Sequence, residues 1–167
     1  MNKTQQYSRP QLFWLVVLRV LIGWYFLYEG LSKVLAPNWT AFGYLKDSKG
    51  VFAPLFDLLT ENSMVMLLVD AANIYGLIII GLCLILGCFV KVAGIGAISL
   101  LSLYYLSDPP LIDVSYILRP EGSYLWVDKN LIILSAVFVL IYFPTSMQIG
   151  LDRLLLKKQK TKKVKNK

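Results

Sequence analysis

The chain has 167 residues, of which 57% are hydrophobic, 13% are aromatic and only 16% are charged. An ordinary soluble domain is excluded by that balance, because such domains carry about 25% charged residues. The formal net charge of +7 does not indicate nucleic-acid binding, because eight basic residues and no acid lie in residues 153–167. Residues 1–152 hold the other nine basic residues against ten acids, a balance of −1.

Four apolar segments approach the length of a membrane span, which is roughly 20 residues for a hydrocarbon core about 30 Å thick. Their approximate bounds are residues 12–36, 65–90, 92–107 and 130–144. We therefore predict an all-α integral membrane four-helix bundle made by one domain over residues 1–152. A basic cytoplasmic tail, predicted to be disordered, follows over residues 153–167 and is expected to contact anionic lipid headgroups or a partner.

Basic residues indicate the orientation, because lysine and arginine accumulate in short cytoplasmic loops. Lys3 and Arg9 precede the first segment, Lys91 lies between the second and third, and the lysine-rich tail follows the fourth. The two remaining loops are mixed or acidic. Both termini are thus predicted to be cytoplasmic. A signal peptide over residues 1–36 is a competing interpretation, but the apolar stretch is too long for one and contains charged residues.

The charged residues of the first segment lie on or beside one helical face. Arg19, Gly23, Phe26, Gly30 and Lys33 fall within about 80° of one another, with Glu29 at the edge of this stripe. Arg19 should face the bundle interior and have a partner, because a lipid-facing guanidinium costs at least about 2.5 kcal/mol. It either serves a site, ties helices together or extends to the headgroups. The glycines permit close approach of another helix or of a flat ligand.

The loop over residues 37–64 is rich in aromatic residues, which favour the membrane interface. Residues 52–59 of this first outer loop are predicted to form a short amphipathic, interfacial helix over the mouth of the bundle, where it could act as a lid.

Polar residues of the later segments are expected at the same outer level as Glu29 and Lys33. The second segment contributes Asp70 and Asn73, the third Tyr104, Tyr105 and Asp108, and the fourth Asp128, Lys129 and Asn130. They form either a functional site near the outer surface or a solvated collar of helix ends.

Metal and haem sites are not indicated, because the chain has no histidine. Its two cysteines, Cys83 and Cys88, lie about 140° apart around one predicted helix and read as packing residues. No phosphate-binding loop, nucleotide fingerprint or internal repeat is visible.

The order of these motifs resembles the DoxX family, and within it the DoxD-like membrane subunits of thiosulfate:quinone oxidoreductases. The likeness covers nearly the whole chain. It is carried by Arg19-x3-Gly23-x2-Phe26-x3-Gly30-x2-Lys33, Asn38-Trp39-Thr40-Ala41, Tyr104-Tyr105-Leu106-Ser107-Asp108-Pro109-Pro110, Val127-Asp128-Lys129-Asn130-Leu131-Ile132 and Gly150-Leu151-Asp152-Arg153-Leu154. The chain departs from the family pattern at Leu77 and Ile133, where many members carry an acid.

The resemblance implies a multi-pass protein of the bacterial cytoplasmic (inner) membrane that passes electrons from an extracytoplasmic, thiosulfate-like sulfur compound to membrane quinone. The implied catalytic carboxylates are Glu29, Asp70 and Asp128. The implied substrate-binding residues are Arg19, Lys33, Asn73, Tyr104, Arg119 and Lys129. The implied quinone-binding residues are Arg19, Gly23, Gly30 and Tyr104. No metal, haem or flavin site is expected in this chain.

Other functions stay open at this stage. Expected partners are the lipid bilayer, quinone, a second redox subunit and further copies of the chain. Without catalysis, the chain would be a membrane scaffold for an extracytoplasmic redox partner or a binder of a small lipid-soluble molecule.

Overall fold

The computed structural model describes residues 6–49, 51–109 and 126–153. Within these residues all the elements of regular secondary structure are helices, and there is no strand. The helices are α1 (Arg9–Leu35), α2 (Phe42–Lys46), α3 (Ala53–Thr60), α4 (Ser63–Leu86), α5 (Val90–Ser107) and α6 (Lys129–Tyr142). Three of them, α1, α4 and α5, are long and apolar enough to cross a membrane, whereas α6 is a shorter apolar helix.

The helix ends follow local sequence signals. Ser8 and Gln11 form a capping box at the start of α1, and the Asn62 side chain caps α4. Gly87 ends α4 in the left-handed conformation, with φ of 65°. The predicted second span, residues 65–90, is therefore wrong at its end, because the helix stops at Leu86.

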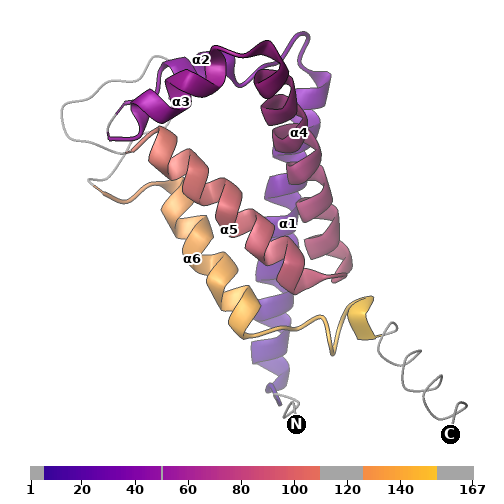
Figure 1. Cartoon of the computed structure of the whole chain (residues 1–167). Coiled ribbons are helices and arrows are strands. Elements are labelled where there is room, and N and C mark those ends of the chain that lie inside the picture. Colours follow the sequence, from indigo (N-terminus) through magenta and orange to yellow (C-terminus); the bar gives the residue numbers. More distant parts are fainter. Residues whose placement is uncertain (1–5, 50, 110–125, 154–167) are drawn as a thin grey trace, which may run out of the picture.

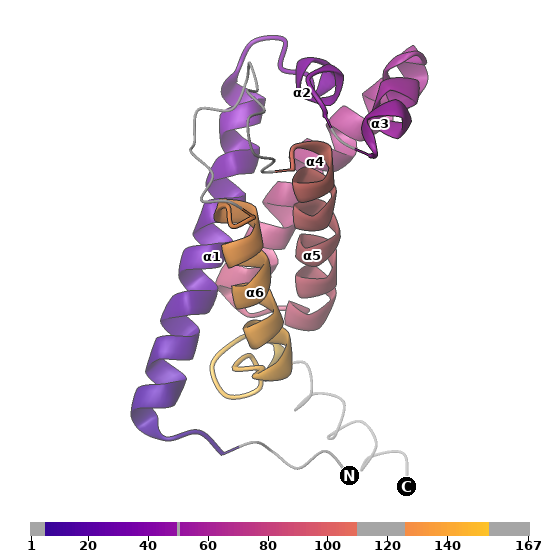
Figure 2. The ribbon, with the colours of Figure 1, turned by 90° about the vertical axis from the view of Figure 1, so that its left-hand side faces the viewer.

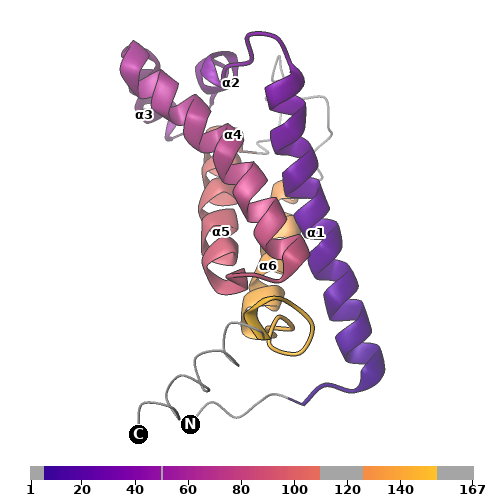
Figure 3. The same ribbon diagram turned by 90° about the vertical axis from the view of Figure 1, so that its right-hand side faces the viewer.

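The four longer helices pack side by side. Helix α1 packs against α4, α4 against α5, α5 against α6, and α6 against α1 (Figures 1 to 3). A single apolar core lies between them, and its fully buried side chains include Phe26, Leu84, Ala97, Leu101 and Val137. Cys83 packs at the edge of this core, and Cys83 and Cys88 are both free thiols. The packing role predicted for Cys83 is confirmed.

The outer surface of these helices is also apolar. Trp14, Leu21, Leu67, Ile79 and Ile95 are each about 60% exposed or more. An exterior of this kind is unfavourable in water and suits contact with lipid acyl chains. The structure therefore supports a multi-pass membrane protein.

Helices α2 and α3 lie across one end of the packed helices, above α5 in Figure 1. The sequence predicted one short helix in this loop, over residues 52–59. The structure confirms it as α3 and adds α2. The beginning of α1 and the segment that follows α6 lie together at the opposite end (Figures 1 and 2). The two ends are called here the α2–α3 end and the α1-start end.

Candidate functional site

The sequence-predicted polar residues gather at the α2–α3 end, between helices from distant parts of the chain. Glu29 and Lys33 come from α1, Asn73 from α4, Tyr104 from α5 and Lys129 from α6. Together with Tyr25, these residues are called the Tyr104 cluster. Four separate helices thus contribute to one small region.

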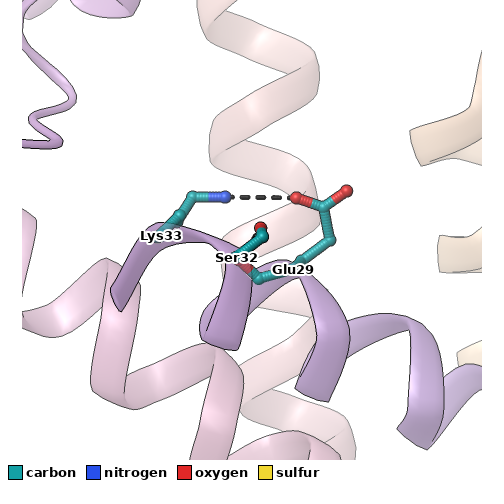
Figure 4. Close-up of polar contacts among 3 residues, drawn as sticks. All are labelled: Glu29, Ser32 and Lys33. Atoms are coloured by element: carbon teal, nitrogen blue, oxygen red, sulfur yellow. Dashed lines mark hydrogen bonds and ion pairs between the residues drawn. The ribbon is translucent and has the colours of Figure 1, made fainter. Parts of the chain in front are cut away.

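Glu29 and Lys33 form an ion pair along one turn of α1. The Lys33 Nζ lies 3.2 Å from Glu29 Oε2, and the two side chains are 16% and 34% exposed, respectively. Figure 4 shows them side by side, with Ser32 between them donating its hydroxyl to the Glu29 carbonyl oxygen at 3.0 Å. Lys33 also lies over the Trp39 ring, 5.2 Å from its centre. This arrangement holds a partly shielded ammonium group at the end of the bundle.

Lys129 brings a second ammonium group to the cluster. Its Nζ lies 5.4 Å from the centre of the Tyr25 ring, so a residue at the start of α6 reaches across to α1. Tyr25 is half-buried and packs against the apolar core. Sequence analysis did not single out Tyr25, because a tyrosine within an apolar span looks like an ordinary packing residue.

The Tyr104 hydroxyl is the buried centre of this cluster. Its polar neighbours are the Asn73 side chain, Tyr25 and Glu29. Tyr104 Oη and Asn73 Oδ1 are buried and have no partner within strict hydrogen-bond geometry among the described residues, although the Asn73 side chain lies close enough to interact with the Tyr104 hydroxyl. Buried polar atoms without partners are uncommon and costly, by about 1–3 kcal/mol each. These two side chains are therefore the buried polar groups to test for hydrogen bonding to a bound molecule.

Helix α2 directly contacts the Tyr104 cluster. The Tyr44 hydroxyl donates to the Tyr104 carbonyl oxygen at 3.2 Å, and the two rings meet edge to face with centres 6.3 Å apart. One turn further on, the Ser48 hydroxyl donates to the Ser107 carbonyl oxygen. Sequence analysis missed Tyr44 as a site neighbour, because its partner lies 60 residues away.

Two of the predicted catalytic carboxylates have structural partners. Asp70 Oδ1 accepts the Ala41 backbone N–H at 2.8 Å and so holds the start of α2. Asp128 is buried and caps α6 by accepting the Leu131 N–H at 2.9 Å. A hydrogen-bonded carboxylate that orders the backbone has less freedom to carry protons, so among the three carboxylates Glu29 is the best placed for chemistry.

The two α1 glycines contact another helix. A side-chain Cβ at Gly23 would lie 2.9 Å from the Ile85 backbone nitrogen, and one at Gly30 would lie 3.0 Å from that of Ile78. Both distances are tighter than ordinary Cβ contacts, and at Gly30 the Cβ would also lie 2.7 Å from Ile78 Cγ1, so the backbones of α1 and α4 lie too close together there for a ligand to enter between them. Of the two alternatives left open by the sequence, close helix packing is the one observed. The side of Gly23 and of Gly30 on which a Cβ would lie is therefore covered by α4.

Arg19 lies near the middle of α1, closer to its start than the cluster residues Tyr25, Glu29 and Lys33. At 1.5 Å per residue, it is about 15 Å along the helix axis from Glu29. The residue is 2% exposed, and its Nη1 donates to Thr145 Oγ1 and to the Ile149 carbonyl oxygen, both at 2.9 Å. The expectation that Arg19 faces inward and has partners is confirmed. Its guanidinium lies beside Gly87, just before the start of α5, whereas Tyr104 is near the end of α5, so the two side chains are at opposite ends of that helix.

Two further predictions concern ligands. Arg119, a predicted substrate-binding residue, lies outside the described residues. Among the residues that the structure describes, no group of three or more histidine, cysteine, aspartate or glutamate side chains is arranged to hold a metal ion.

Comparison with known proteins gives no relative from which to transfer a function. The chain matches no protein-family model, no curated protein and no solved structure. Its function is therefore argued from the site itself.

Proposed function

We propose that this chain is a DoxX-like subunit of the bacterial cytoplasmic membrane that passes electrons from an extracytoplasmic, thiosulfate-like sulfur compound to membrane quinone. In this proposal α6 and the residues after it make the fourth crossing, which completes a four-helix bundle. Both termini are cytoplasmic, as the distribution of basic residues favours. The α2–α3 end then lies on the outer side.

The observation that carries the proposal is the Tyr104 cluster. It combines two ammonium groups, a partly exposed carboxylate and the buried polar side chains of Tyr104 and Asn73 within an apolar bundle. Charged and amide groups are costly inside a membrane domain, and their convergence from four helices favours a role in binding or proton transfer.

The chemistry assigns a role to each kind of group. Two thiosulfate ions that join through their terminal sulfurs release two electrons, and quinone that accepts them takes up two protons. Lys33 and Lys129 would attract the sulfur dianion. Tyr104 and Asn73 would hydrogen-bond the quinone head group, and Glu29 would carry protons to it. Electrons would pass directly to bound quinone or through a partner redox subunit.

A second candidate is a non-enzymatic scaffold for an extracytoplasmic redox protein. This alternative is favoured because Asp70 and Asp128, two of the three carboxylates predicted to be catalytic, order the backbone of α2 and α6, respectively. Binding of a small lipid-soluble molecule without electron transfer would use the same buried polar side chains.

One experiment separates these functions. The chain is purified in mild detergent, its bound small molecules are identified by mass spectrometry, and quinone reduction is measured with thiosulfate as donor. Bound quinone with turnover is the expected result, and Tyr104→Phe should lower both while the protein stays folded. Tyr142→Phe is the matched control, because Tyr142 is 72% exposed and lies at the far end of α6. An inert, empty protein would contradict the redox proposal and favour the scaffold.

A further inference from the structure

Helix α3 presents an apolar surface away from the rest of the molecule. Leu55 and Leu58 are 55% and 60% exposed, and Phe52, at the N-cap, is 44% exposed. The helix is held in place by its other side, on which Phe56 and Thr60 are buried. The exposed leucines therefore do not contribute to packing within the chain.

The polar residues of α3 define a third side. Asp57 forms an ion pair with Lys46 of α2, with 2.7 Å between Lys46 Nζ and Asp57 Oδ1, and both side chains are substantially exposed. Glu61, at the C-cap, is exposed as well. At 100° per residue, Glu61 projects about 60° from Leu58. An apolar strip beside a charged side is the amphipathic pattern of a helix that lies in a membrane interface.

The exposed apolar surface continues from α3 into a membrane-crossing helix. Helix α4 begins three residues after α3 ends, and its first turns expose Met64, Leu67 and Leu68 at 64–70%. Helix α4 is one of the three helices long and apolar enough to cross the bilayer. The acyl chains that surround α4 are thus the nearest apolar environment for the exposed leucines of α3.

We propose that α3 lies within the leaflet at this end of the bundle, with Leu55 and Leu58 among the lipid acyl chains and Asp57 and Glu61 toward the water. The occupant of the exposed face is lipid, rather than a second copy of the chain or a protein partner. Moving the exposed parts of Leu55 and Leu58 from water into acyl chains is favourable and helps to hold the short helix at the interface. This inference does not depend on the redox proposal.

The membrane contact of α3 also positions the cover of the Tyr104 cluster. Phe56 of α3 packs with Leu45 of α2 and with Ala41 at the N-cap of α2, and the Lys46–Asp57 ion pair links the same two helices. Tyr44 of α2 in turn contacts Tyr104. Lipid that holds α3 therefore fixes the depth at which α2 rests on the cluster.

Spin labels at single cysteines test this placement in the full chain. With Cys83 and Cys88 replaced by alanine, a nitroxide is attached at Leu55→Cys, Leu58→Cys or Glu61→Cys in reconstituted lipid vesicles. Ile79→Cys, on the exposed face of α4, serves as the membrane control. Collision with oxygen, which concentrates in lipid, is compared with collision with a water-soluble nickel chelate.

We expect labels at residues 55 and 58 to collide more with oxygen than with nickel, as at residue 79, and the label at 61 to show the reverse. Nickel access at both 55 and 58 would overturn the inference by placing α3 in water. Protection of both labels from oxygen and nickel alike would also overturn it, because a protein surface would then cover the leucines. Circular dichroism of each labelled variant verifies that it is folded.

Discussion

Arg19 and Thr145 are joined by a hydrogen bond of 2.9 Å although 126 residues separate them in the sequence. The bond connects the middle of α1 to the segment that follows α6. The same segment is held by backbone hydrogen bonds from Leu151 N–H to the Leu86 carbonyl and from Asp152 N–H to the Gly87 carbonyl. Asp152 also accepts the Phe89 N–H at 2.8 Å. Arg19 thus fixes the segment that follows α6 against the α4–α5 turn.

Replacing Thr145 by valine should destabilise the protein without affecting the Tyr104 cluster. Valine keeps the shape but removes the hydroxyl that accepts from Arg19. Because the lost partner served a buried charge, the free energy of unfolding should fall by about 1–3 kcal/mol. Unfolding followed by circular dichroism in a detergent titration measures the change.

The matched control for Thr145→Val is Ser135→Ala. Ser135 is exposed and its hydroxyl donates only to the Leu131 carbonyl of its own helix at 2.9 Å. Equal stability of the two variants would mean that the Arg19–Thr145 bond contributes nothing measurable. Unchanged quinone binding in Thr145→Val is expected, because Arg19 lies about 15 Å from Glu29 along α1.

Gly81→Ala should weaken the contact between α1 and α4. A Cβ at Gly81 would lie 2.5 Å from the Leu27 backbone nitrogen, a distance that requires the two backbones to separate. Overpacking of this kind typically costs about 1–3 kcal/mol. The same detergent titration reports the loss.

Gly76→Ala is the control for this effect, since it makes the same chemical change in the same helix. Its Cβ would meet only Leu100 Cδ1, at an ordinary 3.6 Å. Alanine is the better helix former by up to about 1 kcal/mol, so this variant should be neutral or more stable. Equal destabilisation by both substitutions would show that close helix approach is not the cause.

Substitutions at Asp70 should distinguish a structural carboxylate from a catalytic one. Asp70→Asn retains an oxygen that can accept the Ala41 N–H, whereas Asp70→Ala removes it. If Asp70 only positions α2, hydrogen exchange at Ala41 should accelerate in the alanine variant and stay near wild type in the asparagine variant. Loss of turnover in Asp70→Asn, with normal exchange at Ala41, would instead assign Asp70 to proton transfer.

Lys33→Gln should raise the apparent KM for thiosulfate in a preparation that shows turnover. The substitution removes an ammonium group that is 16% exposed while leaving a side chain of similar length. Lys46→Gln is the comparison, because Lys46 pairs with Asp57 on the outside of α2 and α3. Equal KM values in wild type and Lys33→Gln would place the anion elsewhere.

The sequence alone predicted the helical class and the approximate positions of the longer helices, because hydropathy and helix-capping residues act locally. Helical periodicity also placed Arg19 with Gly23 and Gly30 on the inner face of α1, which their burial confirms. Hydropathy alone did not locate the end of a helix where the backbone conformation of a turn residue decides it. The second span therefore ends four residues earlier than predicted, at the left-handed Gly87.

Tertiary packing decided what those inward-facing residues do. The periodicity of α1 is compatible with a ligand or with another helix beside the glycines, and only the approach of α4 selects the helix. In the same way, Arg19 depends on residues that follow α6, and Asp70 depends on the start of α2. Periodicity reports which way a side chain faces, whereas its partner depends on how distant helices pack, and that is a property of the whole chain.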